Sequence, residues 1–151
     1  IKKYNTFISE NIKDYLKPKD NETILNNLKN LSDEEKFISS CKYNIPWLTK
    51  EMLDKGVDPT CEHMDGFYLA CKNGSIDVLK VLLDNDIMIE NLDKGYVQWI
   101  LYKFTDRKPE VVKFLLSNNN FTRNVDDELK DDCLYVINNK DITLEEIRAG
   151  E

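Results

Sequence analysis

The side chains best suited to chemistry are few and widely spaced. His63 is the only histidine and lies two residues after Cys61, while the other cysteines are Cys41, Cys71 and Cys133. Zinc sites use about four ligands, usually arranged in two closely spaced pairs. No second pair accompanies Cys61 and His63 in the sequence. We therefore expect no metal and interpret His63 as an exposed loop residue.

Covalent and acid–base catalysis are not indicated either. A nucleophilic cysteine needs a base within hydrogen-bond reach, and His63 is predicted to lie on a different element from Cys41 and Cys71. Those two cysteines occupy equivalent places, which favours packing of small buried side chains. Most of the paired carboxylates fall at predicted helix starts, where negative charge complements the helix dipole. The common nucleotide, metalloprotease and serine-hydrolase motifs are missing from the sequence. We expect a protein that is not an enzyme and uses no cofactor.

Composition narrows the classes of partner. The chain has 151 residues, 32% of them charged, and a formal net charge of −7. Nucleic acid binding depends on basic side chains that neutralise phosphates, so this chain is predicted to bind no nucleic acid. It is also predicted to bind no membrane, because no apolar run approaches the roughly 18–20 residues of a membrane span. The cysteines form no C-x-x-C pair, which favours a reduced, cytoplasmic setting. An acidic surface of this kind suits a neutral or basic protein surface.

Residues 65–86 predict a pair of short helices around which the chain is organised. Gly74 favours a left-handed helix end, and Ser75 is expected to cap the next helix. The second helix is apolar over more than half its circumference, through Ile76, Leu79, Val81, Leu82 and Leu83. Such a helix must be covered on both sides, so the sequence predicts neighbouring hairpins.

Similar hairpins lie on both sides of this stretch. Residues 41–55 align with 71–85 at an offset of 30, with Asn44 in the place of Gly74. Residues 110–119 align with 77–86 at an offset of 33. A period near 33 residues that carries a helix pair is typical of stacked repeats.

At these residues the chain resembles the ankyrin-repeat family. The stretches "LACKNGSIDVLKVLLDN" and "PEVVKFLLSNN" are similar to the family's A-x-x-G-x-x-x-V-V-K-x-L-L signature. The resemblance implies an all-α, ankyrin-like helical-repeat solenoid of about three repeats. We assign an N-terminal helical cap to 1–31, repeats to about 32–63, 64–93 and 94–125, and a C-terminal cap or degenerate repeat to 126–151. Residues 11–36 also resemble the segment that precedes the repeats in ankyrin-like proteins of large DNA viruses and phages.

The spacing of apolar, capping and proline residues predicts individual helices. We expect them over about 6–16 and 21–30, from Ser32, from Pro46, over 96–104, 109–117 and 127–138, and from a capping box formed by Thr143 and Glu146. The stretches 57–65 and 87–95 are expected to be the fingers between repeats, the second with a short extended segment. Residues 118–127 are expected to form a polar connection with Phe121 as an anchor.

The chain departs from the family in two places. The register over 96–108 is irregular, because Lys103 and Phe104 stand where the family has small residues. The family's T-P-L-H tetrapeptide, which ties neighbouring repeats by hydrogen bonds, is "DGFY" at 65–68. We therefore expect stacking to depend more on apolar packing than it does in the family.

The resemblance implies a non-catalytic protein–protein interaction module that binds, blocks or recruits a partner. The finger tips and the concave helical face would form the binding surface. Its residues would be Glu62, His63, Met64, Asp65, Leu92, Asp93 and Lys94 in the fingers, and Tyr68, Trp99 and Tyr102, near Tyr96, on the helices. The resemblance of residues 11–36 to viral and phage proteins implies a host protein as partner.

Three alternatives remain open at this stage. The aromatic residues could fill gaps in the core instead of meeting a partner. The chain, expected to be a monomer, could form a homodimer through its aromatic surface as a structural protein. It could also sense a small molecule or peptide in a pocket formed by 96–104.

Overall fold

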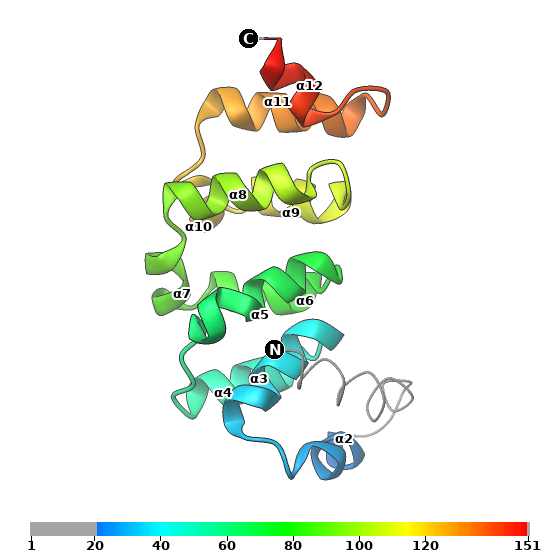
Figure 1. Ribbon diagram of the computed structural model, residues 1–151. Coiled ribbons are helices and arrows are strands. Elements are labelled where there is room, and N and C mark those ends of the chain that lie inside the picture. The colour runs from blue at the N-terminus through cyan, green and yellow to red at the C-terminus, as the bar shows by residue number, and fades with distance from the viewer. Residues whose placement is uncertain (1–20, 151) are drawn as a thin grey trace.

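The computed structural model describes residues 21–150, and within that range the chain consists of helices and turns without a strand (Figure 1). The all-α prediction is confirmed. The helix expected near residues 6–16 lies outside the described residues. The helices are α2 (Asn21–Leu28), α3 (Asp33–Tyr43), α4 (Pro46–Asp54), α5 (Cys61–Lys72), α6 (Ile76–Leu83), α7 (Asp86–Asn91), α8 (Lys94–Phe104), α9 (Pro109–Ser117), α10 (Asn119–Thr122), α11 (Asp127–Asn138) and α12 (Leu144–Ala149).

The helices form layers that lie one above another (Figure 1). Each layer holds a helical hairpin, made by α3 and α4, α5 and α6, α8 and α9, and α11 and α12. Helices in equivalent places pack on one another across the layers, α3 on α5, α5 on α8, and α4 on α6. We call α3, α5, α8 and α11 the first helices and α4, α6, α9 and α12 the second helices.

Local signals set the ends of these helices as predicted. α4 begins at Pro46 and α9 at Pro109, where a missing N–H costs nothing. Asn44 and Gly74 both adopt left-handed conformations, with φ of 56° and 69°, so the equivalence of these two positions is confirmed. Thr143 and Glu146 form the expected capping box at the start of α12.

The cap at the start of α6 differs from the prediction. The side chain of Ser75 makes no capping hydrogen bond, and its buried Oγ has no hydrogen-bond partner in the described part of the chain. Asn44 Oδ1, from the layer before, accepts from the backbone N–H of Val78 at 3.2 Å instead. A side chain of the preceding layer therefore takes the role that the sequence assigned to Ser75.

The prediction of a short extended segment within residues 87–95 is wrong. The first part of this stretch belongs to α7. Asn85 Oδ1 accepts from the Met88 N–H at 3.0 Å and starts this helix. Met88 is fully buried, whereas Ile87 is 50% exposed. In a stretch this short, a helix with one buried and one exposed apolar residue gives the same sequence pattern as an alternating strand.

The same arrangement returns 33 residues later, within the stretch expected to be a polar connection. Asn118 Oδ1 accepts from the N–H groups of Asn120 and Phe121 and starts α10. Phe121 is fully buried, as predicted for an anchor. Asn85 and Asn118 are therefore repeat-equivalent helix caps, and a short third helix accompanies each of the two central hairpins.

The first finger is also helical in part. α5 begins at Cys61, but Glu62, His63 and Met64 have left-handed φ values of 52°, 56° and 63°. A left-handed turn precedes the regular helix, which then passes close to α3. A Cβ on Gly66 would lie 2.8 Å from Cε1 of Phe37, so the close approach of α5 to α3 requires a glycine here.

Apolar packing and polar contacts together hold the layers. The core is continuous through the stack and includes Phe37, Phe67, Leu79, Leu82, Met88, Leu101, Leu115, Phe121, Leu129 and Leu144. Asn120 Nδ2 donates to Leu83 O at 2.9 Å, and Asn124 Nδ2 donates to Leu92 O at 2.6 Å. Asparagine side chains therefore supply hydrogen bonds between layers in addition to the apolar packing that the departure at 65–68 predicts.

Within residues 21–150, no helix has the length and apolar character needed to cross a membrane.

Candidate functional site

Four aromatic side chains gather on the first helices of the two central layers. The ring centroid of Tyr68, on α5, lies 5.6 Å from that of Trp99 and 5.7 Å from that of Phe104, both on α8. Tyr96 lies 5.8 Å from Trp99 and meets Phe67 of the core edge-on at 5.9 Å. Contacts of this kind add about 0.5–1.5 kcal/mol per pair beyond burial. The predicted surface residues Tyr68 and Trp99 are thus brought together across two layers.

These aromatic residues differ in their exposure to water. Trp99 is 47% exposed, while Tyr68 and Tyr96 are half-buried. Tyr102, three residues after Trp99 on α8, is 45% exposed. The hydroxyl of Tyr96 is buried with no hydrogen-bond partner among the described residues, and burial raises the pKa of Tyr96. Tyr96 and, in part, Tyr68 therefore belong to the packing of the stack, as the core alternative expected. Trp99 and Tyr102 present their rings to water.

A further exposed aromatic residue, absent from the sequence-based site, lies on α11. Tyr135 is 54% exposed. Tyr68, Tyr102 and Tyr135 follow one another at spacings of 34 and 33 residues, so the repeat period was the signal that could have found it. We call Tyr68, Trp99, Tyr102 and Tyr135 the aromatic face.

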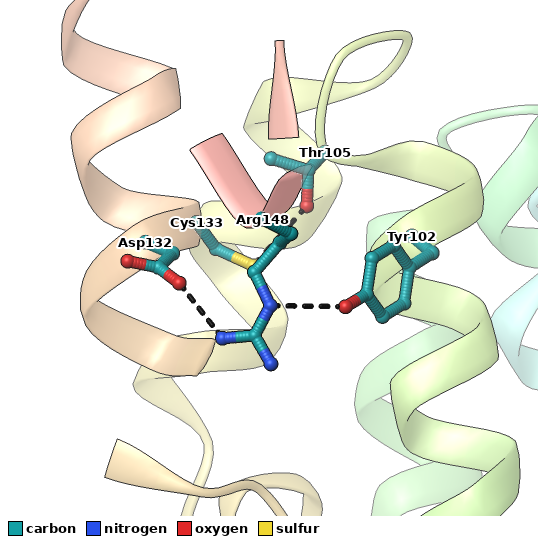
Figure 2. A network of polar contacts seen from close by, with 5 residues as sticks. All are labelled: Tyr102, Thr105, Asp132, Cys133 and Arg148. Carbon is teal, nitrogen blue, oxygen red and sulfur yellow. Dashed lines mark hydrogen bonds and ion pairs between the residues drawn. The ribbon is translucent and has the colours of Figure 1, made fainter. Parts of the chain in front are cut away.

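Arg148, on α12, ties the aromatic face to the last layer (Figure 2). Its Nη1 lies 2.9 Å from Asp132 Oδ2 on α11, and its Nε donates to the Tyr102 hydroxyl at 3.1 Å. The Arg148 and Asp132 side chains are 28% and 17% exposed. Since Asp132 and Tyr135 are three residues apart on α11, Tyr135 lies towards the same side as Tyr102. We call the contacts of Arg148 with Tyr102 and Asp132 the arginine clasp.

The end of α8 is bound to α11 beside this clasp (Figure 2). Thr105 is buried, and its hydroxyl lies 2.6 Å from Leu101 O and 3.4 Å from Cys133 Sγ. Burial raises the pKa of Cys133, so this thiol stays protonated at neutral pH. These contacts hold Tyr102 on a helix that is fixed at its C-terminal end.

The first finger remains at the surface only in part. Glu62 and His63 are exposed in the left-handed turn, whereas Met64 and Asp65 are half-buried. Asp65 Oδ2 is buried with no hydrogen-bond partner among the described residues. Burial, followed by repulsion from Glu62, raises the pKa of the Asp65 carboxyl, and Lys72 opposes the rise.

The second finger requires a correction. Leu92 is fully buried, because it follows α7 and turns into the core, so it does not belong to a binding surface. Asp93 Oδ1 accepts from the Tyr96 N–H at 2.8 Å and caps α8. Lys94 Nζ lies 3.1 Å from Asp126 Oδ1. Asp93 and Lys94 are exposed, and both have structural contacts at the entry to the third and fourth hairpins.

The cysteines are placed for packing. Cys41 and Cys71 are fully buried, and burial raises the pKa of both thiols. Cys61 is half-buried, and its pKa is raised to about 11, first by burial and then by nearby carboxylates. A thiol becomes a strong nucleophile when its pKa is lowered, which is the opposite of what these environments do. Across residues 21–150, no three His, Cys, Asp or Glu side chains are grouped so as to hold a metal ion.

An open cavity of about 370 Å³ lies beside the end of α8, between the α8–α9 turn and the last layer. It is lined by Thr105, Asp106, Pro109, Val136, Ile137, Lys140, Ile142 and Thr143. The pocket suggested for residues 96–104 in the sensor alternative has no counterpart in this lining.

Comparison with known protein families, with curated proteins and with solved structures finds no match for this chain.

Proposed function

We propose that the chain is a divergent ankyrin-like solenoid that acts as a non-catalytic protein-binding module. Support comes from the period near 33 residues, from the stacked helical hairpins, and from the shared left-handed positions Asn44 and Gly74. Because residues 11–36 resemble viral and phage proteins, we expect the partner to be a host protein in the cytoplasm. The module would bind, block or recruit that partner as a monomer.

The aromatic face is the observation that carries this proposal. Tyr and Trp are enriched among the residues that contribute most to protein interfaces. Exposed apolar patches rimmed by polar groups commonly mark interaction sites. Here Trp99, Tyr102 and Tyr135 are each about half exposed on the first helices of adjacent layers. A partner laid across α8 and α11 would cover all three rings.

The rings are also held in place before any partner arrives. Trp99 packs on Tyr68 and Tyr96, and the Tyr102 hydroxyl accepts from Arg148. Side chains already fixed by packing and hydrogen bonds lose little conformational entropy on binding, so more of the contact energy appears as affinity.

Paired substitutions test the proposal. In affinity purification from cells that contain the partner, Trp99→Ala with Tyr102→Ala should reduce capture by at least about tenfold. The matched control replaces two other exposed apolar residues, Leu25 and Ile87, which are 37% and 50% exposed. Leu25→Ala with Ile87→Ala should leave capture unchanged, and both proteins should keep the helical circular dichroism of the parent. Full capture by the Trp99 and Tyr102 variant would contradict the proposal.

Light scattering tests whether the chain is a monomer in solution. At micromolar concentration we expect the mass of a single chain of 17.7 kDa. A dimer that Trp99→Ala dissociates would instead assign the aromatic face to a second copy of the chain.

A further inference from the structure

Charge is distributed unevenly along the stack. Between Asp126 and Gly150 there are eight carboxylate side chains and three basic ones. Between Lys94 and Arg123 there are six basic side chains and two carboxylates. The aromatic face spans the boundary between these two layers, with Trp99 and Tyr102 on one side and Tyr135 on the other.

On α11, carboxylates accompany the exposed tyrosine. Glu128, Asp131 and Tyr135 are all exposed, and their spacings of three and four residues place them along one side of the helix. Asp132, on the flank of this group, is already paired with Arg148. Among the described residues, Glu128 and Asp131 form no ion pair, and both lie on the same side of α11 as Tyr135.

On α8 the surroundings are different. The polar residues beside Trp99 and Tyr102 are Gln98 and Lys103, both half-buried. α8 itself contains no carboxylate, and the next one, Asp106, comes two residues after the helix ends. The aromatic face thus has an apolar part on α8 and an acidic, aromatic part on α11.

We propose that the aromatic face binds a basic segment of the partner protein, with an apolar side chain of that segment on Trp99 and Tyr102 and Lys or Arg side chains over α11. The inference rests on the protein-binding function proposed above and specifies the chemistry of its partner. Glu128 and Asp131 attract a cation, and the ring of Tyr135 adds a cation–π contact. An acidic segment would meet repulsion at the same place, so the charges select the partner as well as steer it.

Selection from a random dodecapeptide phage library tests this partner chemistry. The library is selected on the full chain, with counter-selection on the Trp99→Ala, Tyr102→Ala variant, whose fold is checked by circular dichroism. We expect the enriched peptides to be net basic and to carry an aromatic or large aliphatic residue.

Two other outcomes would overturn the inference, and they differ in what they leave standing. Enrichment of neutral or acidic peptides that depend on Trp99 and Tyr102 would overturn the basic partner but keep the proposed function. Failure to enrich any peptide on the parent chain relative to the variant would overturn both.

A charge-matched comparison then locates the contact. For a selected peptide measured by fluorescence anisotropy, Glu128→Gln with Asp131→Asn should weaken binding about fivefold to tenfold and reduce its salt dependence. The control, Asp84→Asn with Glu90→Gln, removes the same charge from an exposed residue directly after α6 and an exposed residue of α7 and should leave affinity within about twofold. An equal loss in both variants would show that only net charge acts, and would overturn the placement over α11.

Discussion

The two sides of the helical stack differ in what they present to water. On α6 and α9 the outward residues are charged, with Asp77, Lys80, Glu110 and Lys113 all exposed. Asp77 and Lys80 form a 3.6 Å ion pair with both side chains about 60% exposed, which contributes little to stability. On α8 and α11 the outward residues include half-exposed aromatic rings instead. Both sides cover the same continuous core.

This difference distinguishes the outward residues that the fold requires from those that a partner would contact. A surface helix is satisfied by charged side chains on its outer side, as α6 and α9 demonstrate. The half-exposed aromatic rings on α8 and α11 leave apolar surface in contact with water, which charged side chains in the same positions would not. Among residues 21–150 the exposed aromatic rings lie on α8 and α11, which favours a binding role for that side.

The largest effect on stability should come from the shared core. Leu82 is fully buried in α6, so Leu82→Ala should lower the free energy of unfolding by about 2–5 kcal/mol, through lost burial and a cavity. Chemical denaturation measures the change. Val81→Ala, at a half-buried neighbour, is the control and should cost less. A loss below about 0.5 kcal/mol for Leu82→Ala would contradict the assignment of the core.

Substitution of Asn44 should have the second largest effect on stability, because this residue has two roles. Asn44→Ala loses both the hydrogen bond to the Val78 N–H and an easily formed left-handed residue, together about 2 kcal/mol. Asn44→Gly keeps the backbone conformation and should cost only about 1 kcal/mol. Thermal or urea unfolding of the two variants separates the terms. Equal losses would mean that the hydrogen bond across the layers contributes all of the effect.

The arginine clasp should matter less, because it is partly open to solvent. Arg148→Ala removes contacts with Asp132 and Tyr102, and about 1 kcal/mol is expected, which corresponds to about 2–4 °C in Tm for a chain of this size. Hydrogen exchange should show faster exchange in α12 with little change in α6. Tyr102→Phe, which loses only one hydrogen bond, is the matched control. Uniform loss of protection across the stack would contradict a local clasp.

The smallest effect is a pH dependence at Asp65. Because burial raises the pKa of Asp65 above its ordinary value of 3.8, the folded chain binds this proton more readily than the unfolded chain. Ionised Asp65 therefore destabilises the fold at neutral pH. Asp65→Asn should be slightly more stable than the parent at pH 7, and this advantage should disappear as the pH falls below 3.8. Unfolding at several pH values measures it, with Asp77→Asn on the opposite side as the control.

Much of the architecture could be predicted from sequence because its signals are local. Proline at the start of α4 and α9, left-handed positions at Asn44 and Gly74, and apolar residues at helical spacing each act within one or two turns. The 33-residue period then brings equivalent helices together. The ends of α9 and α11 agree with the predicted 109–117 and 127–138.

The predictions from sequence failed where contacts with residues distant in the sequence determine the local structure. Leu92 and Ser75 were misassigned because burial by a neighbouring layer and the side chain of Asn44 are not visible in their local sequence. The clasp joins Arg148 to Tyr102 across 46 residues and depends on how α12 folds back. Within the candidate site, Trp99 and Tyr102 were located by their place on a predicted first helix and by the family resemblance, whereas Tyr135 needed the repeat period and Arg148 needed the structure.

Site-specific photocrosslinking measures the difference between the two sides most directly. A benzophenone amino acid is placed at Trp99 in one protein and at Lys113, exposed on α9, in another. Each protein is irradiated with cells or extract that contain the partner. The aromatic face predicts a crosslinked partner from position 99 and none from position 113. Crosslinking to the same protein only from position 113 would contradict the aromatic face as the binding surface.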